Sequence, residues 1–395
     1  MKINLFLLCA LLCNNVLAQP FQIGHTTMTL IDASRNNRNI PTEIYYPTDI
    51  AGDNIPMTMA NNDQFPVISF GHGFVMTWDA YQNIWEAVVA EGFIMAFPKT
   101  EAGIAPSHFE FGKDIAFVIS ELNALGQNNA SLFYNRIDSM NCVIGHSMGG
   151  GSAFLAAQMS PVVKALATLA PAETTPSAIQ AAASVNLPSL IFAGGNDCVT
   201  PPAGHQIPMY DALTSDCKTY ISIQGGSHCQ MANNNALCSF GELTCSPQPT
   251  ISREEQHAVI NRYLLPWLKY ELKGDCIAGA QFDSLIVFDD SIAFQKSCSL
   301  CSASHNNEIN SNFQVDVFPN PFNDYLFIQC DTFTKGMLTV DLYAMDGCRI
   351  FSKSFSNLKV YDKLKLSLPE DFPEGIYLLK VTTAGRNVSR KIIKQ

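Results

Sequence analysis

The sequence predicts an α/β protein in which a mostly parallel, doubly wound sheet is followed by a small C-terminal all-β sandwich. Between residues 21 and 301, short apolar runs rich in β-branched residues alternate with amphipathic stretches, the pattern of strands covered by helices on both faces. From residue 313 to residue 395 the chain changes to short alternating strands separated by turn residues. Residues 302–312 are rich in Ser and Asn and lack apolar periodicity, so they are predicted to be a linker.

Length and charge exclude several classes of protein. The 395 residues suffice for two or three domains, and 47% hydrophobic against 15% charged residues excludes a disordered chain. Lys and Arg number 24 against 35 Asp and Glu, so the net charge of −11 leaves no overall basic field to attract nucleic acid. We therefore expect no nucleic-acid partner.

The N-terminus predicts export. Lys2 precedes an apolar run over residues 3–12, and a small-residue cleavage site ends at Ala18, so residues 1–18 are a predicted signal peptide and the catalytic domain spans residues 19–301. A lipid anchor at Cys13 is disfavoured by the bulky Leu12 before it. No other segment offers the roughly 20 uninterrupted apolar residues of a membrane span, so we expect a secreted protein without a transmembrane segment.

Six short apolar runs are predicted to be buried strands of the sheet. They cover residues 65–70, 93–97, 141–144, 165–169, 190–193 and 219–223. Between the second and the third run, apolar residues recur at helical spacing over residues 115–125. This spacing predicts a helix with one apolar face against the sheet.

A G-x-S-x-G motif follows the third predicted strand. Gly145-His146-Ser147-Met148-Gly149 stands between that strand and a plausible helix start at residues 150–156. The motif requires this context, because the nucleophile sits on a strained strand-to-helix turn that neighbouring glycines allow to close. Ser147 is therefore the predicted nucleophile.

An acid and a histidine follow Ser147 in the order that such a site requires. Asp197 comes after the strand at 190–193, and His228 comes after the strand at 219–223, both beside glycines. Taken singly, Asp197 is more simply interpreted as a turn residue and His228 as a loop residue. Their joint order predicts a catalytic triad in which His228 moves the Ser147 proton and Asp197 orients the imidazole.

Two backbone N–H groups are expected to form an oxyanion hole. Met148, the residue after the nucleophile, supplies one, and Phe74, in the glycine-containing loop after the first predicted strand, supplies the other. His72 in that loop is interpreted as a packed loop residue.

Residues 65–275 resemble the secreted α/β-hydrolases that include cutinase-like polyester hydrolases and poly(ethylene terephthalate) hydrolases. The matching segments are Gly73-Phe74, residues 145–151, 190–197 and 207–211, and Gly225-Gly226-Ser227-His228. The resemblance implies the α/β-hydrolase fold, the triad of Ser147, Asp197 and His228, and the oxyanion pair of Phe74 and Met148. It also implies a shallow acyl-binding groove lined by Phe74, His146, Met148 and Val199.

Two positions depart from the pattern of this family. Phe74 stands where many members have tyrosine, and Ala172 stands where the polyester hydrolases usually have an aromatic-stacking tryptophan. The departures place turnover of aromatic polyesters in question and leave ester chemistry intact.

The C-terminal residues resemble the type A sorting domain of the type IX secretion system. The resemblance rests on Val317-Phe318-Pro319-Asn320-Pro321, the Asp346-Gly347 turn, residues 375–380 and the closing Arg390-Lys391-Ile392-Ile393-Lys394. It implies that residues 313–395 direct a second export step by the type IX secretion machinery. The alternative is an immunoglobulin-like accessory or binding module.

The cysteines are expected to form disulfides, because the chain is exported. Cys198 follows the acid and Cys229 follows the histidine, so a bond between them would join the two catalytic loops, as a comparable disulfide does in similar family members. We further expect Cys276 with Cys298 and Cys238 with Cys245, whereas Cys142 is expected to be a buried free thiol. Zinc binding by His228, Cys229, Cys238 and Cys245, and a redox role for Cys298-Ser299-Leu300-Cys301, are both disfavoured.

These observations predict a secreted, monomeric serine carboxylic-ester hydrolase that works through an acyl-enzyme without metal or cofactor. Its expected substrates are polymeric or hydrophobic esters, with poly(ethylene terephthalate) as one candidate. No insertion between residues 197 and 228 is large enough to form a lid, so bulky substrates are expected to reach the groove. The alternatives are a lipase-like or chlorophyllase-like esterase of small or lipid esters, and a non-catalytic surface adhesin.

Overall fold

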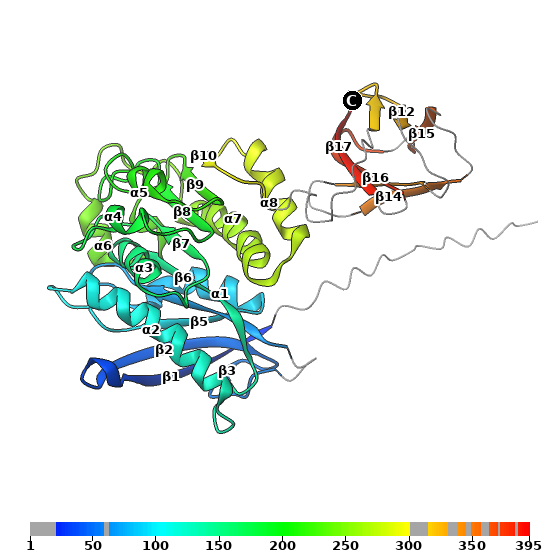
Figure 1. Cartoon of the computed structure of the whole chain (residues 1–395). Helices are drawn as coiled ribbons and strands as arrows, with labels where there is room; N and C mark the ends of the chain where they lie inside the picture. The colour runs from blue at the N-terminus through cyan, green and yellow to red at the C-terminus, as the bar shows by residue number, and fades with distance from the viewer. Residues whose placement is uncertain are drawn as a thin grey trace, which may run out of the picture. The chain divides into compact units, whose positions relative to one another are not determined.

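The computed structural model describes residues 21–58, 63–300, 315–330, 338–344, 349–356, 363–369, 372–383 and 386–395. The chain divides into two compact units, Met1–Ser302 and Ala303–Gln395, each with its own sheets and core (Figure 1). The predicted signal peptide and the predicted linker at 302–312 lie outside the described residues. So does the predicted turn at Asp346-Gly347.

The first unit is built on one ten-stranded sheet with the order β10-β9-β8-β7-β6-β4-β5-β2-β1-β3. Neighbouring strands are parallel from β5 to β9, whereas β2 runs antiparallel to β1 and β5, and β10 runs antiparallel to β9. The strands are β1 (Gln22–Asp32), β2 (Arg38–Thr48), β3 (Gly52–Asp53), β4 (Phe65–Gly71), β5 (Ile94–Pro98), β6 (Ile137–His146), β7 (Leu166–Leu169), β8 (Ser189–Gly194), β9 (Lys218–Ile223) and β10 (Ile292–Lys296).

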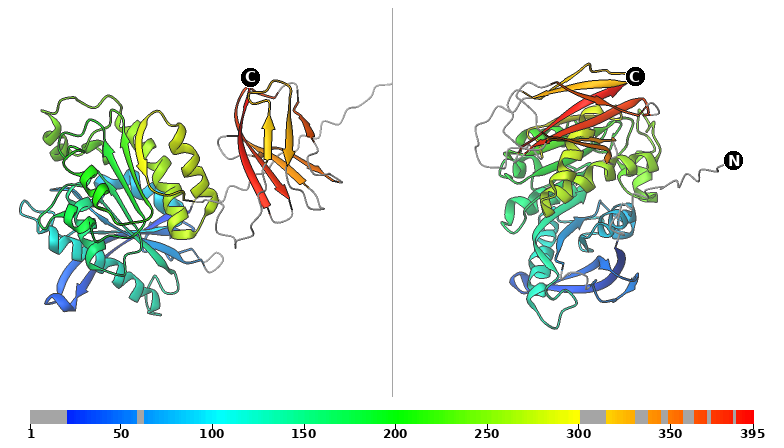
Figure 2. Two further views of the ribbon diagram at one scale, coloured as in Figure 1. Left: turned by 45° about the horizontal axis from the view of Figure 1, so that its top comes forward. Right: turned by 90° about the vertical axis from the view of Figure 1, so that its right-hand side faces the viewer.

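Helices cover both faces of this sheet, as the two views in Figure 2 show. The buried apolar residues of this unit form two cores. The first core contains residues of α2, α3, α4 and α5, and the second core contains residues of α1, α7 and α8. A further short helix, α6, follows the strand β9. The helices are α1 (Gln82–Ala90), α2 (His108–Gln127), α3 (Met148–Met159), α4 (Ala178–Ala182), α5 (Gln206–Ala212), α6 (Ala236–Glu242), α7 (Arg253–Lys273) and α8 (Cys276–Phe288).

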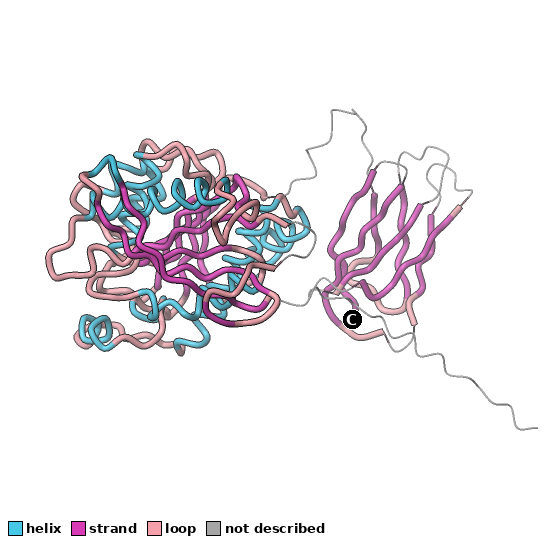
Figure 3. Tube along the Cα trace, turned by 90° about the horizontal axis from the view of Figure 1, so that it is seen from below, coloured by secondary structure: helices cyan, strands magenta, loops and turns pink. Residues whose placement is uncertain are grey.

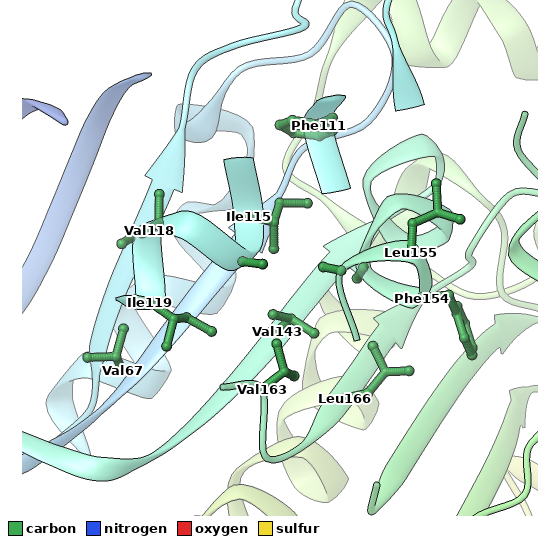
Figure 4. Packing of buried hydrophobic residues seen from close by; sticks show 14 of the residues in the cluster. Val67, Phe111, Ile115, Val118, Ile119, Val143, Phe154, Leu155, Val163 and Leu166 are labelled. Atoms are coloured by element: carbon green, nitrogen blue, oxygen red, sulfur yellow. The ribbon is translucent and has the colours of Figure 1, made fainter. Parts of the chain in front are cut away.

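The first core holds α2 and α3 against the parallel strands. Ser107 caps α2 by accepting a hydrogen bond from the Glu110 N–H, and the apolar residues of α2 then recur on one buried face. Ile115 and Ile119 of that face lie near Val67 and Val143 of the sheet, beside the labelled residues of α3 (Figure 4). This packing fixes the start of α3, and therefore the end of β6, against the sheet.

The second unit consists of two packed antiparallel sheets. One sheet has the order β11-β12-β15 and the other β14-β13-β16-β17, and the described part of the unit contains strands and loops (Figure 3). Alternate residues such as Leu326, Ile328, Leu379 and Val381 are buried between the sheets. The strands are β11 (Val315–Phe318), β12 (Tyr325–Cys330), β13 (Leu338–Tyr343), β14 (Arg349–Phe355), β15 (Lys363–Ser367), β16 (Gly375–Thr383) and β17 (Arg386–Lys394).

The predicted fold class is confirmed. All six predicted strands occur, as β4 to β9, and the helix predicted over residues 115–125 is the second half of α2. The antiparallel pair β1 and β2, the edge strand β10 and the short helix α6 were not predicted from the sequence. Among the described residues, no helix is both long and apolar enough to span a membrane.

Ile119 provides a test of the first core. Ile119 is fully buried, so Ile119→Ala should lower the free energy of unfolding by about 2–5 kcal/mol through lost burial and the resulting cavity. Ile104 is 88% exposed, so Ile104→Ala should change stability by less than about 0.5 kcal/mol. Urea unfolding of both variants checks the prediction, and equal effects would contradict the assigned packing.

Candidate active site

Ser147 lies on the sharp turn between β6 and α3. Its backbone has φ 54° and ψ −121°, a conformation that is unfavourable for a residue with a side chain. Backbone hydrogen bonds hold the turn: the Ser147 N–H donates to the Leu169 carbonyl, and the Ser147 carbonyl accepts from the N–H groups of Gly151 and Ala172. The turn therefore presents Ser147, which is 9% exposed, at the carboxyl edge of the sheet.

Two glycines make this turn sterically possible. A Cβ atom on Gly145 would lie 2.2 Å from the Gly149 carbonyl oxygen, and a Cβ atom on Gly149 would lie 2.2 Å from the Gly71 carbonyl oxygen. Both distances are far below any real contact, so a side chain on Gly145 would push β6 away from the start of α3, and a side chain on Gly149 would push α3 away from the end of β4. Glycine is needed at these two positions because the backbones of β6, α3 and β4 approach too closely to leave room for a side chain.

Asp197 and His228 form a buried pair. The Asp197 Oδ2 atom lies 2.8 Å from Nδ1 of His228, and both side chains are almost completely buried. The other carboxylate oxygen, Oδ1, accepts hydrogen bonds from the backbone N–H groups of Val199 and Thr200. The loop after β8 thus fixes the carboxylate, and the carboxylate orients the imidazole ring that follows β9.

Thr200 and Gln206 extend this pair, and neither was identified from the sequence. The Thr200 hydroxyl lies 2.9 Å from Asp197 Oδ2 and 3.0 Å from His228 Nδ1. The Gln206 side-chain amide donates to the Thr200 hydroxyl at 3.1 Å and to the Pro171 carbonyl at 2.7 Å. Proximity of Thr200 to Asp197 in the sequence is the only signal that could have pointed to it.

His146 is completely buried, so the expectation that it lines an acyl-binding groove is wrong. Its Nε2 atom lies 3.2 Å from the carbonyl oxygen of His228, and its Nδ1 atom lies 3.0 Å from the Tyr81 hydroxyl. Because a carbonyl only accepts, Nε2 carries the proton, and Nδ1 accepts from Tyr81. Burial, reinforced by the nearby His228 ring, holds the pKa of His146 well below its usual value and keeps it neutral.

The same Tyr81 hydroxyl reaches the predicted oxyanion loop. It accepts a hydrogen bond of 2.8 Å from the N–H of Gly73, the residue before Phe74. Tyr81 is fully buried. A continuous chain of hydrogen bonds therefore runs from Gly73 through Tyr81 and His146 to the backbone of His228, and it joins the oxyanion loop to the histidine loop.

The remaining predicted site residues differ in exposure. Phe74 and Val199 are 47% and 39% exposed, so their side chains are available to a ligand. Met148 begins α3, but its side chain packs in the first core and is only 4% exposed. Its side chain is therefore not available to a groove at the surface, contrary to the expectation from the resemblance. His72 is buried with each ring nitrogen 2.9 Å from a backbone carbonyl, that of Gly73 or that of Thr100.

The expected disulfide pairings are wrong. Cys198 and Cys229, which follow Asp197 and His228, are bonded to the segment around α6 instead of to each other. Cys298 is not bonded to Cys276, which is itself disulfide-bonded. The observed pairs are Cys198–Cys245, Cys217–Cys298 and Cys229–Cys238.

Cys142 is a buried free thiol, as expected, and burial raises its pKa and leaves it unreactive. Cys229, Cys238 and Cys245 are in disulfides, so they offer no thiolates for the zinc site considered from the sequence. Within the described ranges, no cluster of His, Cys, Asp or Glu is arranged to hold a metal ion.

The two disulfides at the catalytic loops should differ in their effect on stability. Cys198–Cys245 spans 47 residues and Cys229–Cys238 spans 9, so chain entropy predicts losses of about 4 and about 2.5 kcal/mol when each pair is replaced by serine. Urea unfolding of C198S/C245S and C229S/C238S checks the order. The reverse order would contradict the chain-entropy explanation.

Comparison with known proteins identifies both parts of the chain. Residues 17–245, more than half of the chain, match the family described as PET hydrolase-like. Relatives include cutinase 1 of Thermobifida cellulosilytica, 25% identical over 53% of this chain and 72% of that protein, and a cutinase of Thermobifida fusca, 25% identical over 53% and 62%. A bis(hydroxyethyl) terephthalate hydrolase of Streptomyces coelicolor is 25% identical over 47% of this chain and 54% of that protein.

The C-terminal unit matches a different family. Residues 316–395 match the secretion system C-terminal sorting domain, so the protein is secreted. The segment that matches the hydrolases contains Ser147, Asp197 and His228, together with the buried network around them. The chain therefore belongs to the PET hydrolase-like family.

Proposed function

We propose that the protein is a secreted serine ester hydrolase in which Ser147, His228 and Asp197 form a catalytic triad. Membership of the PET hydrolase-like family supports the class of carboxylic-ester hydrolases. The buried Asp197–His228 hydrogen bond of 2.8 Å carries the finer proposal. This bond fixes the imidazole ring of His228. His146, the residue directly before Ser147, hydrogen-bonds to the His228 carbonyl and so joins the histidine loop to the turn of the proposed nucleophile.

The proposed reaction begins with attack of the Ser147 Oγ atom on the ester carbonyl carbon. Nε2 of His228 takes the hydroxyl proton, while Asp197 accepts the Nδ1–H hydrogen bond and stabilises the imidazolium that forms. The negative charge moves to the carbonyl oxygen, which the N–H groups of Met148 and Phe74 are proposed to bind. His228 then returns the proton to the alcohol oxygen as the C–O bond breaks, leaving an acyl-enzyme on Ser147.

Water completes the proposed cycle. His228 takes a proton from a water molecule, whose oxygen attacks the acyl carbon, and the same two N–H groups bind the second oxyanion. The proton then passes to the Ser147 Oγ atom as the acid leaves. Thr200 supports both halves of the reaction by holding Asp197 Oδ2, and Gln206 holds Thr200 in turn.

The proposed substrates are hydrophobic and polymeric esters, and aliphatic polyesters fit the exposed residues best. Phe74 and Val199 offer apolar contacts at the surface, and relatives of the chain carry the names cutinase and bis(hydroxyethyl) terephthalate hydrolase. Ala172 leaves no ring to stack on an aromatic polyester at that position. We further propose that the protein is monomeric and that its sorting domain engages the type IX secretion machinery.

Ser147→Ala tests the nucleophile. The variant should lose at least about a thousandfold in kcat for p-nitrophenyl butyrate, because no other group can form the acyl-enzyme. Hydrolysis is followed by absorbance, with circular dichroism as the folding control. Undiminished turnover in a folded variant would refute the proposal, and rapid labelling of the parent by a fluorophosphonate would separate an enzyme from a non-catalytic adhesin.

Tyr81→Phe tests the hydrogen-bond chain behind the oxyanion loop. Loss of the hydroxyl leaves the Gly73 N–H and Nδ1 of His146 without their partner, so stability should fall by about 1–3 kcal/mol. We also expect kcat to fall by about tenfold with a smaller change in KM, because the loop would place Phe74 less accurately. Tyr134 is 43% exposed, and Tyr134→Phe is the matched control. A loss of stability with kcat unchanged would reduce Tyr81 to a purely structural role.

Product analysis then distinguishes the substrate classes. Chromatography of the products from tributyrin, an aliphatic polyester film and poly(ethylene terephthalate) should show turnover of the first two and least turnover of the third. Activity confined to tributyrin would favour the lipase-like alternative.

A further inference from the structure

The helix α6 presents an exposed apolar face. Leu237, Phe240 and Leu243 are 61%, 74% and 69% exposed, and together they form what we call the α6 platform. Leu237 and Phe240 lie in the helix, and Leu243 is its C-terminal cap. Their spacing of three residues places all three side chains along one side of α6. Space around the platform is open, because a Cβ atom on Gly241 would have no neighbour within 4 Å. Three large apolar side chains so exposed within seven residues are unusual in a secreted protein.

The platform is held rigidly despite its length. A seven-residue helix is not stable by itself. Here the Asn235 side chain caps its first turn, and disulfides anchor Cys238 within it and Cys245 just after it. Glu242 points inward and accepts hydrogen bonds from the Cys229 N–H and the Ser227 hydroxyl. The exposed face therefore keeps its shape when nothing covers it.

Both disulfides place the platform beside the proposed triad. Cys229 is next to His228, and Cys238 is next to Leu237, so the Cα–Cα distance of 5.6 Å between the cysteines puts Leu237 within about 13 Å of His228. By the same reasoning through Cys198–Cys245, Leu243 lies within about 17 Å of Asp197. Val199, which is 39% exposed, directly follows Cys198, so one more exposed apolar side chain adjoins this disulfide.

The charge of this region limits what can bind there. Residues 231–252 contain no Lys or Arg, and their one acid, Glu242, is turned inward. Arg253, the next residue, is also turned inward, because its guanidinium donates hydrogen bonds to the carbonyls of Cys229 and Ala232. An anionic membrane surface is recognised through Lys and Arg clusters, which this face lacks. A solid that has apolar segments and no ionic groups matches the uncharged, apolar α6 platform.

We propose that the α6 platform is a docking surface for solid aliphatic polyester, which it holds against the mouth of the active site. This inference rests on the proposed function, because the polymer must also be a substrate. Docking buries Leu237, Phe240 and Leu243 on the polymer, and the disulfides keep the docked surface near Asp197 and His228.

Adsorption to a poly(ε-caprolactone) film tests the proposal. The full chain carrying Ser147→Ala is used so that the film is not consumed, and adsorption is followed with a quartz crystal microbalance. Adding L237S, F240S and L243S should weaken adsorption at least about tenfold, since burial of even one such side chain is worth that factor. The matched control adds I31S, I277S and V287S, which replace side chains 56%, 83% and 60% exposed on β1 and α8, and it should adsorb like its parent.

Activity measurements separate failure of this inference from failure of the proposed function. With Ser147 restored, the platform variant should show a lower ratio of film hydrolysis to p-nitrophenyl butyrate hydrolysis than the control variant. Equal adsorption of the two variants would overturn the docking proposal while leaving the triad intact. A change of oligomeric state in light scattering with adsorption unchanged would assign the platform to self-association and also overturn it. Loss of p-nitrophenyl butyrate turnover on Ser147→Ala tests the triad alone.

Discussion

The strained backbone at Ser147 is the constraint on which the rest of the catalytic unit depends. A positive φ at a residue with a side chain costs free energy, and the fold supplies that energy through three backbone hydrogen bonds and the packing of α3 against the sheet. Gly145 and Gly149 let β4, β6 and α3 approach closely enough for those bonds to form. The core under α2 and α3 therefore also supports Ser147, the proposed nucleophile.

A second layer of buried polar groups positions the loops around that turn. Asp197 is held by Thr200, which Gln206 holds in turn, and His228 is held through its carbonyl by His146. Tyr81 carries the network on to the oxyanion loop. These groups hydrogen-bond to one another, and linked buried polar groups of this kind make a site rigid and specific. Within the described residues, Oε1 of Gln206 is the acceptor of this network that is buried without a hydrogen-bond partner. None of them needs to touch the substrate to influence the reaction.

The sequence predicted the elements whose signals are local. Each buried strand is a short apolar run, and the Ser147 turn is marked by glycines on both sides, so both could be identified from neighbouring residues. Asp197 and His228 were found because the carboxyl ends of parallel strands meet at one edge of the sheet. Tyr81 and Gln206 could not be found, because their roles arise from contacts with distant segments, such as that between Tyr81 and His146, 65 residues apart. The resemblance predicted the position of His146 near the site but not the direction of its side chain, which is buried. For the cysteines, adjacency to Asp197 and His228 did not determine which pairs form.

The pairing of the cysteines has a consequence for when the enzyme matures. Cys198 and Cys229, which directly follow the acid and the base of the proposed triad, are covalently bonded to the segment around α6, and disulfides do not persist in a reducing cytoplasm. Before export, the loops that carry Asp197 and His228 therefore lack these crosslinks, and oxidation after export supplies them. The redox state of the compartment thus determines when the loops that carry Asp197 and His228 become rigid. The chain is synthesised in one compartment, and its disulfides form in another.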